Sequence, residues 1–225
     1  MRDVLPPQVF NRIAEHLREG CGEAEQGWES AQEDEDTITG DCFSSLRTGW
    51  PRTFDGEGRL WKWKFSYKKF RGRGGGAPEH ILGADGIIQI DFEDTETGRI
   101  LNKGLLFQAK KYNNRDHSEL HSQARKMERL IPGASAVFEY GPDHYRAFES
   151  ATVMEHEGNL GVMPSSPDHR LGNFLAERFL PCEVGVQGFY YEPWSRTLVV
   201  PNSTSGVIRY RARLKHRLRI EVRKF

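Results

Sequence analysis

This chain is constrained most by two apolar segments that a polar turn joins, within residues 80–111. Residues 86–92 are apolar and rich in β-branched side chains, and residues 104–110 are apolar again. Between them, residues 94–99 have the composition of a turn. Two such segments joined in this way predict a β-hairpin with buried strands.

Three polar side chains are expected at one end of this hairpin. Because side chains alternate along a strand, Gln108 and Lys110 share one face, and Phe107 and Ala109 share the other. Asp85 stands at the start of the first strand, so a carboxylate, an amide and an ammonium group converge there. A purely structural interpretation stays open, in which Asp85 caps a turn and Lys110 extends into water.

The order of these motifs resembles that of a known nuclease superfamily. A Gly-Ala-Asp sequence ending at Asp85 precedes one strand, and a Gln-Ala-Lys sequence ending at Lys110 closes the next. This arrangement resembles the PD-(D/E)xK, or restriction-endonuclease-like, nucleases, in the branch whose second motif is Q-x-K instead of E-x-K. The motifs cover residues 80–111, and the order of elements extends the resemblance to about residues 30–150. It implies an α/β fold with a mixed central sheet flanked by helices.

The resemblance also implies a catalytic site that binds Mg²⁺ or Mn²⁺. Asp85 would be the main ligand, and Gln108 and the main-chain oxygen of Ala109 would complete a set of oxygen donors of the kind Mg²⁺ prefers. Lys110 would orient or deprotonate the attacking water and offset charge at the phosphate. Gln in place of Glu removes one negative charge, so another acid is needed nearby.

Residues 33–47 are the first candidates for that acid, because the superfamily often supplies it from a helix before the motif. Their pattern fits a helix with Glu35 near its start. Glu35 is our candidate catalytic residue, although acids in a first turn are also favoured by the helix dipole alone. Glu33, Glu79 and Asp91 are the alternatives.

Size and composition indicate a globular protein of one domain, or a core with a small appendage. The chain has 225 residues, of which 37% are hydrophobic and 28% charged. We expect a nuclease-like core with N-terminal helices in residues 1–154, and a C-terminal helix with strands in residues 155–225, packed on the same domain. No apolar run approaches the roughly 20 residues that span a bilayer, and the N-terminus lacks the apolar core of a signal peptide.

The cysteines favour a reducing compartment. The three cysteines are widely separated in sequence and form no CxxC pair, which argues against a disulfide scaffold and a zinc ribbon. The cytoplasm is therefore the expected location.

The remaining periodicity predicts further helices and strands. Helices are expected at 8–18, where Gly20 and Gly22 end the first helix, and at 117–130 and 173–180. Strands are expected at 59–68, 134–140, 144–148, 189–191, 196–200 and 207–222. The last of these alternates apolar and basic residues, so it is either a charge-protected edge strand or a strand that lies along a nucleic-acid backbone.

The net charge of zero conceals strong segregation, with acids between residues 23 and 36 and basic residues in 59–73 and 209–224. The basic loop after the strand at 59–68 ends near the proposed site, so its Lys and Arg residues are expected to contact nucleic acid. These residues are Lys68, Lys69, Arg71 and Arg73.

Two other motifs have weaker functional interpretations. His117 and His121 are one helical turn apart, but without the HExxH order a solvated helix face is favoured over a metal pair. The glycines after residue 71 do not form a Walker loop, because no Gly-Lys-Ser/Thr follows them.

The leading hypothesis is a metal-dependent nuclease that acts on DNA, as the effector of a bacterial restriction or anti-phage system. A small chain with little beyond the nuclease core suggests that a partner subunit senses the target, and cleavage of both strands would suggest a homodimer. The main alternative is a catalytically silent nucleic-acid-binding or scaffold protein on the same fold. A Cys- or Ser-based hydrolase ranks last, because no GxSxG motif is present.

Overall fold

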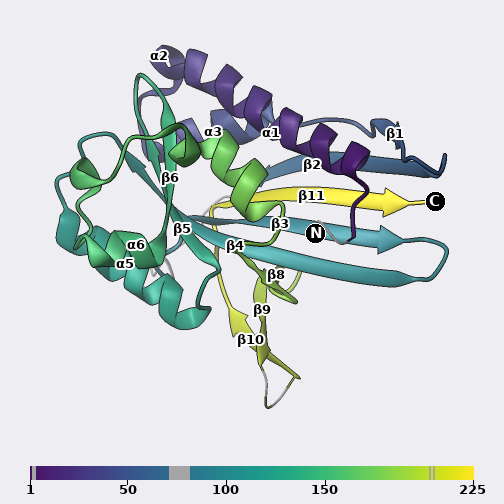
Figure 1. Ribbon diagram of the computed structural model, residues 1–225. Coiled ribbons are helices and arrows are strands. Elements are labelled where there is room, and N and C mark those ends of the chain that lie inside the picture. Colours follow the sequence, from purple (N-terminus) through teal and green to yellow (C-terminus); the bar gives the residue numbers. More distant parts are fainter. Residues whose placement is uncertain (2–3, 71–81, 203, 205) are drawn as a thin grey trace.

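An eight-stranded mixed sheet runs through the computed structural model, which describes residues 1, 4–70, 82–202, 204 and 206–225 (Figure 1). Seven strands follow the order β1-β2-β11-β3-β4-β5-β6, and β7 pairs with β4. The β11–β3 and β4–β5 pairs are parallel, and the other pairs are antiparallel. A separate sheet has the order β10-β9-β8. The chain is thus mixed α/β, with helices on the central sheet and additional strands in its C-terminal region.

The strands and helices have the following bounds. The strands are β1 (Arg52–Phe54), β2 (Leu60–Lys69), β3 (Gly86–Asp94), β4 (Arg99–Lys111), β5 (Ser135–Tyr140), β6 (Tyr145–Glu149), β7 (Val186–Gln187), β8 (Tyr190–Glu192), β9 (Thr197–Asn202), β10 (Gly206–Arg211) and β11 (His216–Lys224). The helices are α1 (Pro7–Gln26), α2 (Trp28–Ala31), α3 (Glu35–Ser45), α5 (His117–Leu130), α6 (Ser150–Glu155) and α7 (Leu171–Asn173), with short helical turns η1 (Leu160–Val162), η2 (Pro167–His169) and η3 (Phe174–Phe179).

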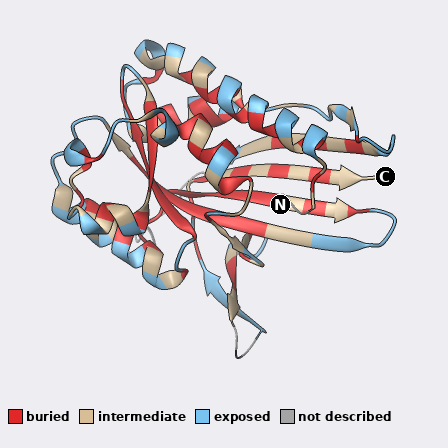
Figure 2. Ribbon diagram, in the orientation of Figure 1, coloured by how far each residue is buried: buried red, intermediate tan, exposed pale blue. Residues whose placement is uncertain are grey.

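Different helices cover the two faces of the main sheet. On one face, α1, α3, α7 and η3 share the largest apolar cluster with alternate residues of the central strands. On the other face, α5 and α6 cover β5, and the small β8–β10 sheet packs over β3 and β4. Figure 2 shows buried positions along the central strands, between these layers.

The predicted hairpin is confirmed as β3 and β4, which pair from Gly86 opposite Phe107 to Asp94 opposite Arg99. The alternation predicted for β4 is confirmed too. Phe107 and Ala109 pack in the cluster beneath α1 and α3, whereas Gln108 turns to the opposite face. This register places the start of β3 and the end of β4 at the same end of the sheet.

The first helix is longer than predicted, since α1 continues to Gln26 through both glycines that were expected to end it. Gly20 is needed for packing, because a Cβ there would lie 2.7 Å from a methyl carbon of Leu46, the residue that follows α3. Close helix contact therefore explains this glycine, and the prediction that it ends the helix was wrong.

The predicted strand at 207–222 is in fact two strands in two different sheets. Its first part is β10, which lies at the edge of the small sheet, and its second part is β11, which lies between β2 and β3 in the main sheet. Ala212 and Leu214, in the link between them, are buried in the cluster under the small sheet. The edge-strand alternative is therefore wrong for β11, which has a neighbour on each side. Residues after 154 contribute both β7 and β11 to the main sheet.

The predicted helix at 173–180 begins earlier, at Leu171, and continues from Phe174 to Phe179 as a π-helix. The predicted helix at 117–130 is confirmed as α5. The aromatic strand at 59–68 is confirmed as β2, with Trp61, Trp63 and Phe65 buried on one face.

Gly86→Ala is expected to destabilise the fold strongly. A Cβ at Gly86 would lie 2.5 Å from the Phe107 ring and 2.6 Å from the main-chain oxygen of His216, so neither neighbour can make room easily. Overpacking of this kind costs about 1–3 kcal/mol. Urea unfolding measures the loss, and Gly49→Ala is the control, because a Cβ there meets no atom within 4 Å. Equal unfolding midpoints for the two variants would contradict the close strand contact.

Candidate active site

A cavity of about 360 Å³ lies at the end of the sheet where β4 ends and where β3 and β11 begin. The N-terminal end of α3 and the first turns of α5 line its sides. Most of its lining side chains are ionisable or polar; the lining residues are Asp34, Glu35, Asp36, Thr39, Asp85, Gln108, Ala109, Lys110, Glu119, Gln123, Lys215 and His216. All four residues that the sequence predicted as catalytic are therefore brought to one cavity.

Asp85 is the most enclosed carboxylate in this cavity, with 8% of its surface exposed. Its Oδ2 accepts hydrogen bonds from Gln108 Nε2 at 2.6 Å and from the main-chain N–H of Ala109 at 2.9 Å. Its Oδ1 lies 3.3 Å from Lys215 Nζ. Asp85, which precedes β3, thus contacts both the end of β4 and Lys215, the residue before β11.

The side-chain nitrogen of Gln108 lies between the Asp85 carboxylate and the main-chain oxygen of Ala109. Gln108 Nε2, which donates to Asp85, also lies 3.1 Å from the main-chain oxygen of Ala109. The two ends of an amide have the same shape, so a half-turn of the Gln108 amide would place Oε1 where Nε2 lies. A carboxylate, an amide oxygen and a carbonyl oxygen would then face one another, which is a donor set that fits Mg²⁺ or Mn²⁺.

This donor set contains one acid only. Among the described residues, no three His, Cys, Asp or Glu side chains form a group that could hold a metal ion. Metal binding at Asp85 would therefore depend on the neutral oxygens of Gln108 and Ala109, with Glu35 as the nearest predicted acid.

Burial raises the pKa of Asp85 above its ordinary value, although the Lys215 ammonium and the Ala109 N–H act in the opposite direction. A buried carboxylate loses hydration when it ionises, and only part of that loss is recovered from these neighbours. Lys110 also lowers the pKa of Asp85 through its charge. The nearby cations thus offset part of the effect of burial, and the pKa of Asp85 remains raised.

Metal binding is expected to strengthen as the pH rises through the raised pKa of Asp85, because the metal competes with a proton for this carboxylate. Lys215 lowers that pKa, so Lys215→Gln should move the midpoint of the pH dependence to a higher pH. Calorimetric titration with Mn²⁺ from about pH 5 to about pH 8 measures both effects. A midpoint that does not move would exclude Asp85 as the titrating ligand.

The acids at the start of α3 have different partners. Glu35 Oε1 lies 3.3 Å from the main-chain N of Lys111, at the end of β4, and Asp34 caps the helix through Thr37 N at 2.7 Å. Asp36 is paired with Lys69 and lies 2.7 Å from His216 Nε2. Burial opposes ionisation of Asp36, but these two neighbours keep its pKa below the ordinary value. Asp34 and Glu35 thus contact main-chain groups, whereas Asp36 is paired with two side chains.

The alternative acids do not lie in the cavity lining. Asp91 shares the face predicted for it, but it accepts hydrogen bonds from Gln89 and Asn102 and pairs with Arg219, further along the sheet. Glu33 is absent from the lining, and Glu79 lies outside the described residues. Glu119, at the start of α5, does line the cavity and was missed by the sequence analysis.

β11 and the residue before it contribute two groups that the sequence analysis also missed, Lys215 and His216. His216 is 1% exposed, and its Nδ1 lies 2.8 Å from the Tyr67 hydroxyl. Burial lowers the pKa of His216 to about 4, so the imidazole is neutral at pH 7. The only signal in the sequence was their position in a basic segment, which does not show that this segment pairs with β3.

The predicted lysines and arginines have different positions. Lys110 lines the cavity, and its ammonium group forms no hydrogen bond or ion pair with the residues that the structure describes. Lys69 pairs with Asp36 at the cavity edge, whereas Lys68 lies 5.3 Å from the Phe70 ring centre. Arg71 and Arg73 lie outside the described residues. Lys68 and Lys69 belong to β2 and not to the predicted loop, and of these two Lys69 lies beside the cavity.

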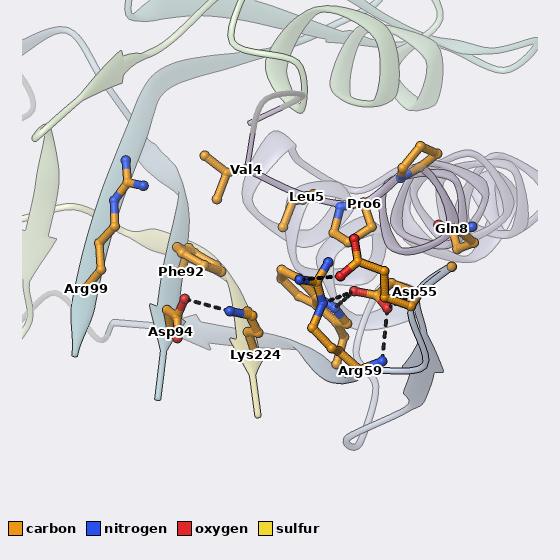
Figure 3. Close-up of a pocket in the computed structure, with 14 residues that line it drawn as sticks. Val4, Leu5, Pro6, Gln8, Asp55, Arg59, Phe92, Asp94, Arg99 and Lys224 are labelled. Carbon is orange, nitrogen blue, oxygen red and sulfur yellow. Dashed lines mark hydrogen bonds and ion pairs between the residues drawn. The ribbon is translucent and has the colours of Figure 1, made fainter. Parts of the chain in front are cut away.

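A cavity of about 530 Å³ lies at the opposite end of the main sheet (Figure 3). Two carboxylates in its lining are paired: Asp55 binds Arg59 at 2.7 Å, and Asp94 binds Lys224 at 3.0 Å, whereas the Arg99 guanidinium forms no ion pair with a described residue. Figure 3 shows these pairs facing each other across short distances. Such paired groups are explained by stability, so this cavity is a weaker candidate for catalysis than the one around Asp85.

No protein-family model, curated protein or solved structure matches this chain. None of the helices in the described ranges combines the length and the apolar character needed to cross a membrane.

Proposed function

We propose that this protein is a metal-dependent nuclease with a restriction-endonuclease-like fold, and that DNA is its substrate. The observation that carries the proposal is the convergence of Asp85, Gln108 and the Ala109 carbonyl on one point, with Lys110 in the same cavity. These groups come from the two strands that the motif resemblance identifies.

Asp85, Gln108 and the Ala109 main-chain oxygen would hold Mg²⁺ or Mn²⁺, with Glu35 of the same cavity as the further acid. The metal, when bound, supplies positive charge that stabilises the phosphate and the leaving alkoxide. Lys110 extends into the same cavity with no protein partner among the described residues, so its amine is available to orient a water or accept its proton. Lys215 adds a second ammonium group beside Asp85, which suits an anionic substrate.

DNA is the favoured substrate because the Q-x-K branch that the motifs resemble is common in bacterial restriction and anti-phage systems. Within such a system the protein would act in the cytoplasm as the cutting subunit, with sensing by a partner and cleavage of both strands by a homodimer. Lys110 and Lys215 line the cavity, and Lys69 pairs with Asp36 at its edge, so ammonium groups that could bind phosphate lie close together.

A second candidate function is nucleic-acid binding without hydrolysis. The observation that favours it is that Gln108, Ala109 and Lys215 already satisfy both oxygens of Asp85. A carboxylate with these partners needs no metal for its stability, so the same residues could be a purely structural remnant of an active site.

Incubation with plasmid, linear duplex, single-stranded DNA and RNA, each in Mg²⁺, Mn²⁺ or EDTA, distinguishes the two functions. The nuclease proposal expects cleavage of DNA in either metal and none in EDTA. Binding of DNA in EDTA with no cleavage in any metal would support the second function and contradict the first. Cleavage that persists in EDTA would exclude the metal-dependent mechanism.

A further inference from the structure

A larger cavity, of about 710 Å³, lies next to the candidate active site. It is formed by the chain after β4, the turn between β5 and β6, the start of α5 and the segment around η1. Its size falls in the range that encloses small organic ligands. None of the groups proposed to bind the metal or to act on the water lines it.

A buried ion pair lies in the lining of this cavity. Glu139 and Arg146 have side chains that are 5% and 11% exposed, and Arg146 Nε donates to Glu139 Oε2 at 2.8 Å. Arg146 Nη2 also donates to Oε2, and to the Leu160 carbonyl at 3.4 Å. Glu139 Oε1 and Arg146 Nη1 have no hydrogen-bond partner among the described residues. The buried pair therefore leaves one acceptor and one donor available to a ligand.

An aromatic residue and several basic side chains surround this pair. Tyr112 is 53% exposed and forms no ring contact with another described aromatic side chain. Asn113 has a left-handed backbone (φ 63°), which turns the chain after β4 around the cavity. Arg115, His117 and His144 also line it, and none of them forms an ion pair within the part of the chain that the structure describes.

The two cavities are adjacent along the same structural elements. Tyr112 continues the pairing of β4 with β5, since its N–H donates to the Tyr140 carbonyl at 2.7 Å. Tyr112 therefore follows Lys110 by two residues of extended chain, or about 7 Å. Helix α5 also borders both cavities, with His117 in this one and Glu119 in the active-site cavity. A nucleic-acid strand that crosses Lys110 would reach Tyr112 within one or two nucleotides.

We propose that this cavity binds an unpaired nucleotide of the substrate strand, next to the phosphate that is cleaved. The amino group of the base would donate to Glu139, and an adjacent ring acceptor would receive a hydrogen bond from Arg146. Tyr112 would stack on the base, and Arg115 would contact a phosphate. This inference rests on the proposed function for its link to cleavage, and it narrows the substrate to single-stranded DNA or to a base flipped out of a duplex.

Binding of mononucleotides in EDTA tests the cavity without any cleavage. Calorimetry with the four deoxynucleoside monophosphates is expected to show binding to the wild type, weakest for thymidine monophosphate, because thymine has no amino group. Tyr112→Ala should weaken binding about tenfold or more. Trp194→Ala is the matched control, since this aromatic side chain is 99% exposed and lies outside the cavity lining.

A second variant tests the buried pair. Glu139→Gln keeps the shape of the side chain but offers an amide in place of a carboxylate, so it should abolish the preference among the four nucleotides. Circular dichroism should show a folded protein. No binding to the wild type, or equal binding to wild type and Tyr112→Ala, would overturn the inference.

The two proposals can fail separately. Metal-dependent cleavage by the wild type together with no nucleotide binding would overturn the cavity assignment and leave the nuclease. Nucleotide binding that is lost in Tyr112→Ala, with no cleavage in any metal, would leave a nucleotide-binding cavity on a protein that is not a nuclease.

Discussion

Asp85→Asn should abolish metal-dependent cleavage while leaving the protein at least as stable as the wild type. Asparagine keeps the shape of the side chain but removes the charge that would hold the metal. Loss of one electrostatic group that stabilises a transition state costs about a hundredfold to a thousandfold, and loss of the main metal ligand should cost at least that much. Plasmid cleavage in Mg²⁺ measures the effect.

The expected stability follows from the sign of the pKa shift. The pKa of Asp85 is higher in the folded protein than in the unfolded chain, because burial disfavours the ionised form. As the pH rises from the unfolded pKa of about 4 to the raised folded pKa, the unfolded chain ionises more readily than the folded protein. The free energy of unfolding of the wild type therefore decreases over this pH range. The asparagine side chain of the variant stays neutral, and its oxygen can still accept from Gln108 and Ala109.

Urea unfolding at pH 8 tests the stability of Asp85→Asn. Asp94→Asn is the matched control, because Asp94 lies at the other end of β3 and pairs with Lys224. The control should lose some stability and keep full activity. A large loss of stability in Asp85→Asn would show that Asp85 is a structural group, and full activity in that variant would exclude it as a metal ligand.

Lys110→Met should lose cleavage and retain metal binding. If the Lys110 amine orients or deprotonates the attacking water, its removal should lower the rate about a hundredfold to ten-thousandfold. The metal ligands remain, and removal of a nearby positive charge does not weaken the attraction of a cation to Asp85. Single-turnover cleavage and Mn²⁺ calorimetry, at a pH above the pKa of Asp85, measure the two effects separately.

Lys111→Met is the control for this lysine, because it removes the same charge from the next residue. Lys111 belongs to the opposite face of β4 and donates to the Gln32 carbonyl at 2.6 Å, so it should affect stability more than cleavage. Equal loss of cleavage in both variants would show that the rate responds to net charge and not to a specific amine.

The parts of the fold that local patterns determine were predictable. The β3–β4 hairpin joins residues that are close in sequence, and two-residue alternation was enough to place Gln108 and Phe107 on opposite faces. Helix α5 was equally predictable, since its apolar residues recur at helical spacing. Asp85, Gln108 and Lys110 could be brought together because they lie within this one hairpin.

The rest depended on contacts between distant segments. Alternation along β11 is compatible with an edge strand or a central one, and its pairing with β2 and β3 decides between them. Lys215 and His216 could therefore not be assigned to the site. Gly20 allows close contact between α1 and Leu46, which is distant in sequence, so the glycine alone did not show whether the helix continues. Asp91 lies on the predicted face of β3, but about 20 Å along the strand from Asp85, and alternation does not give that distance.

The central position of β11 has a consequence for the order of folding. β2 and β3 follow each other along the chain, but each pairs with β11 and not with the other, across more than 120 residues. Contacts between residues so far apart in sequence form slowly. Until they form, the edges of β2 and β3 that pair with β11 stay exposed and can associate with other chains. During synthesis on the ribosome, β2 and β3 cannot be joined into one sheet until residues 216–224 have left the exit tunnel. A nascent or truncated chain without β11 would thus lack Lys215 and His216 at the cavity. The site would be assembled only after this last strand has been synthesised and has paired.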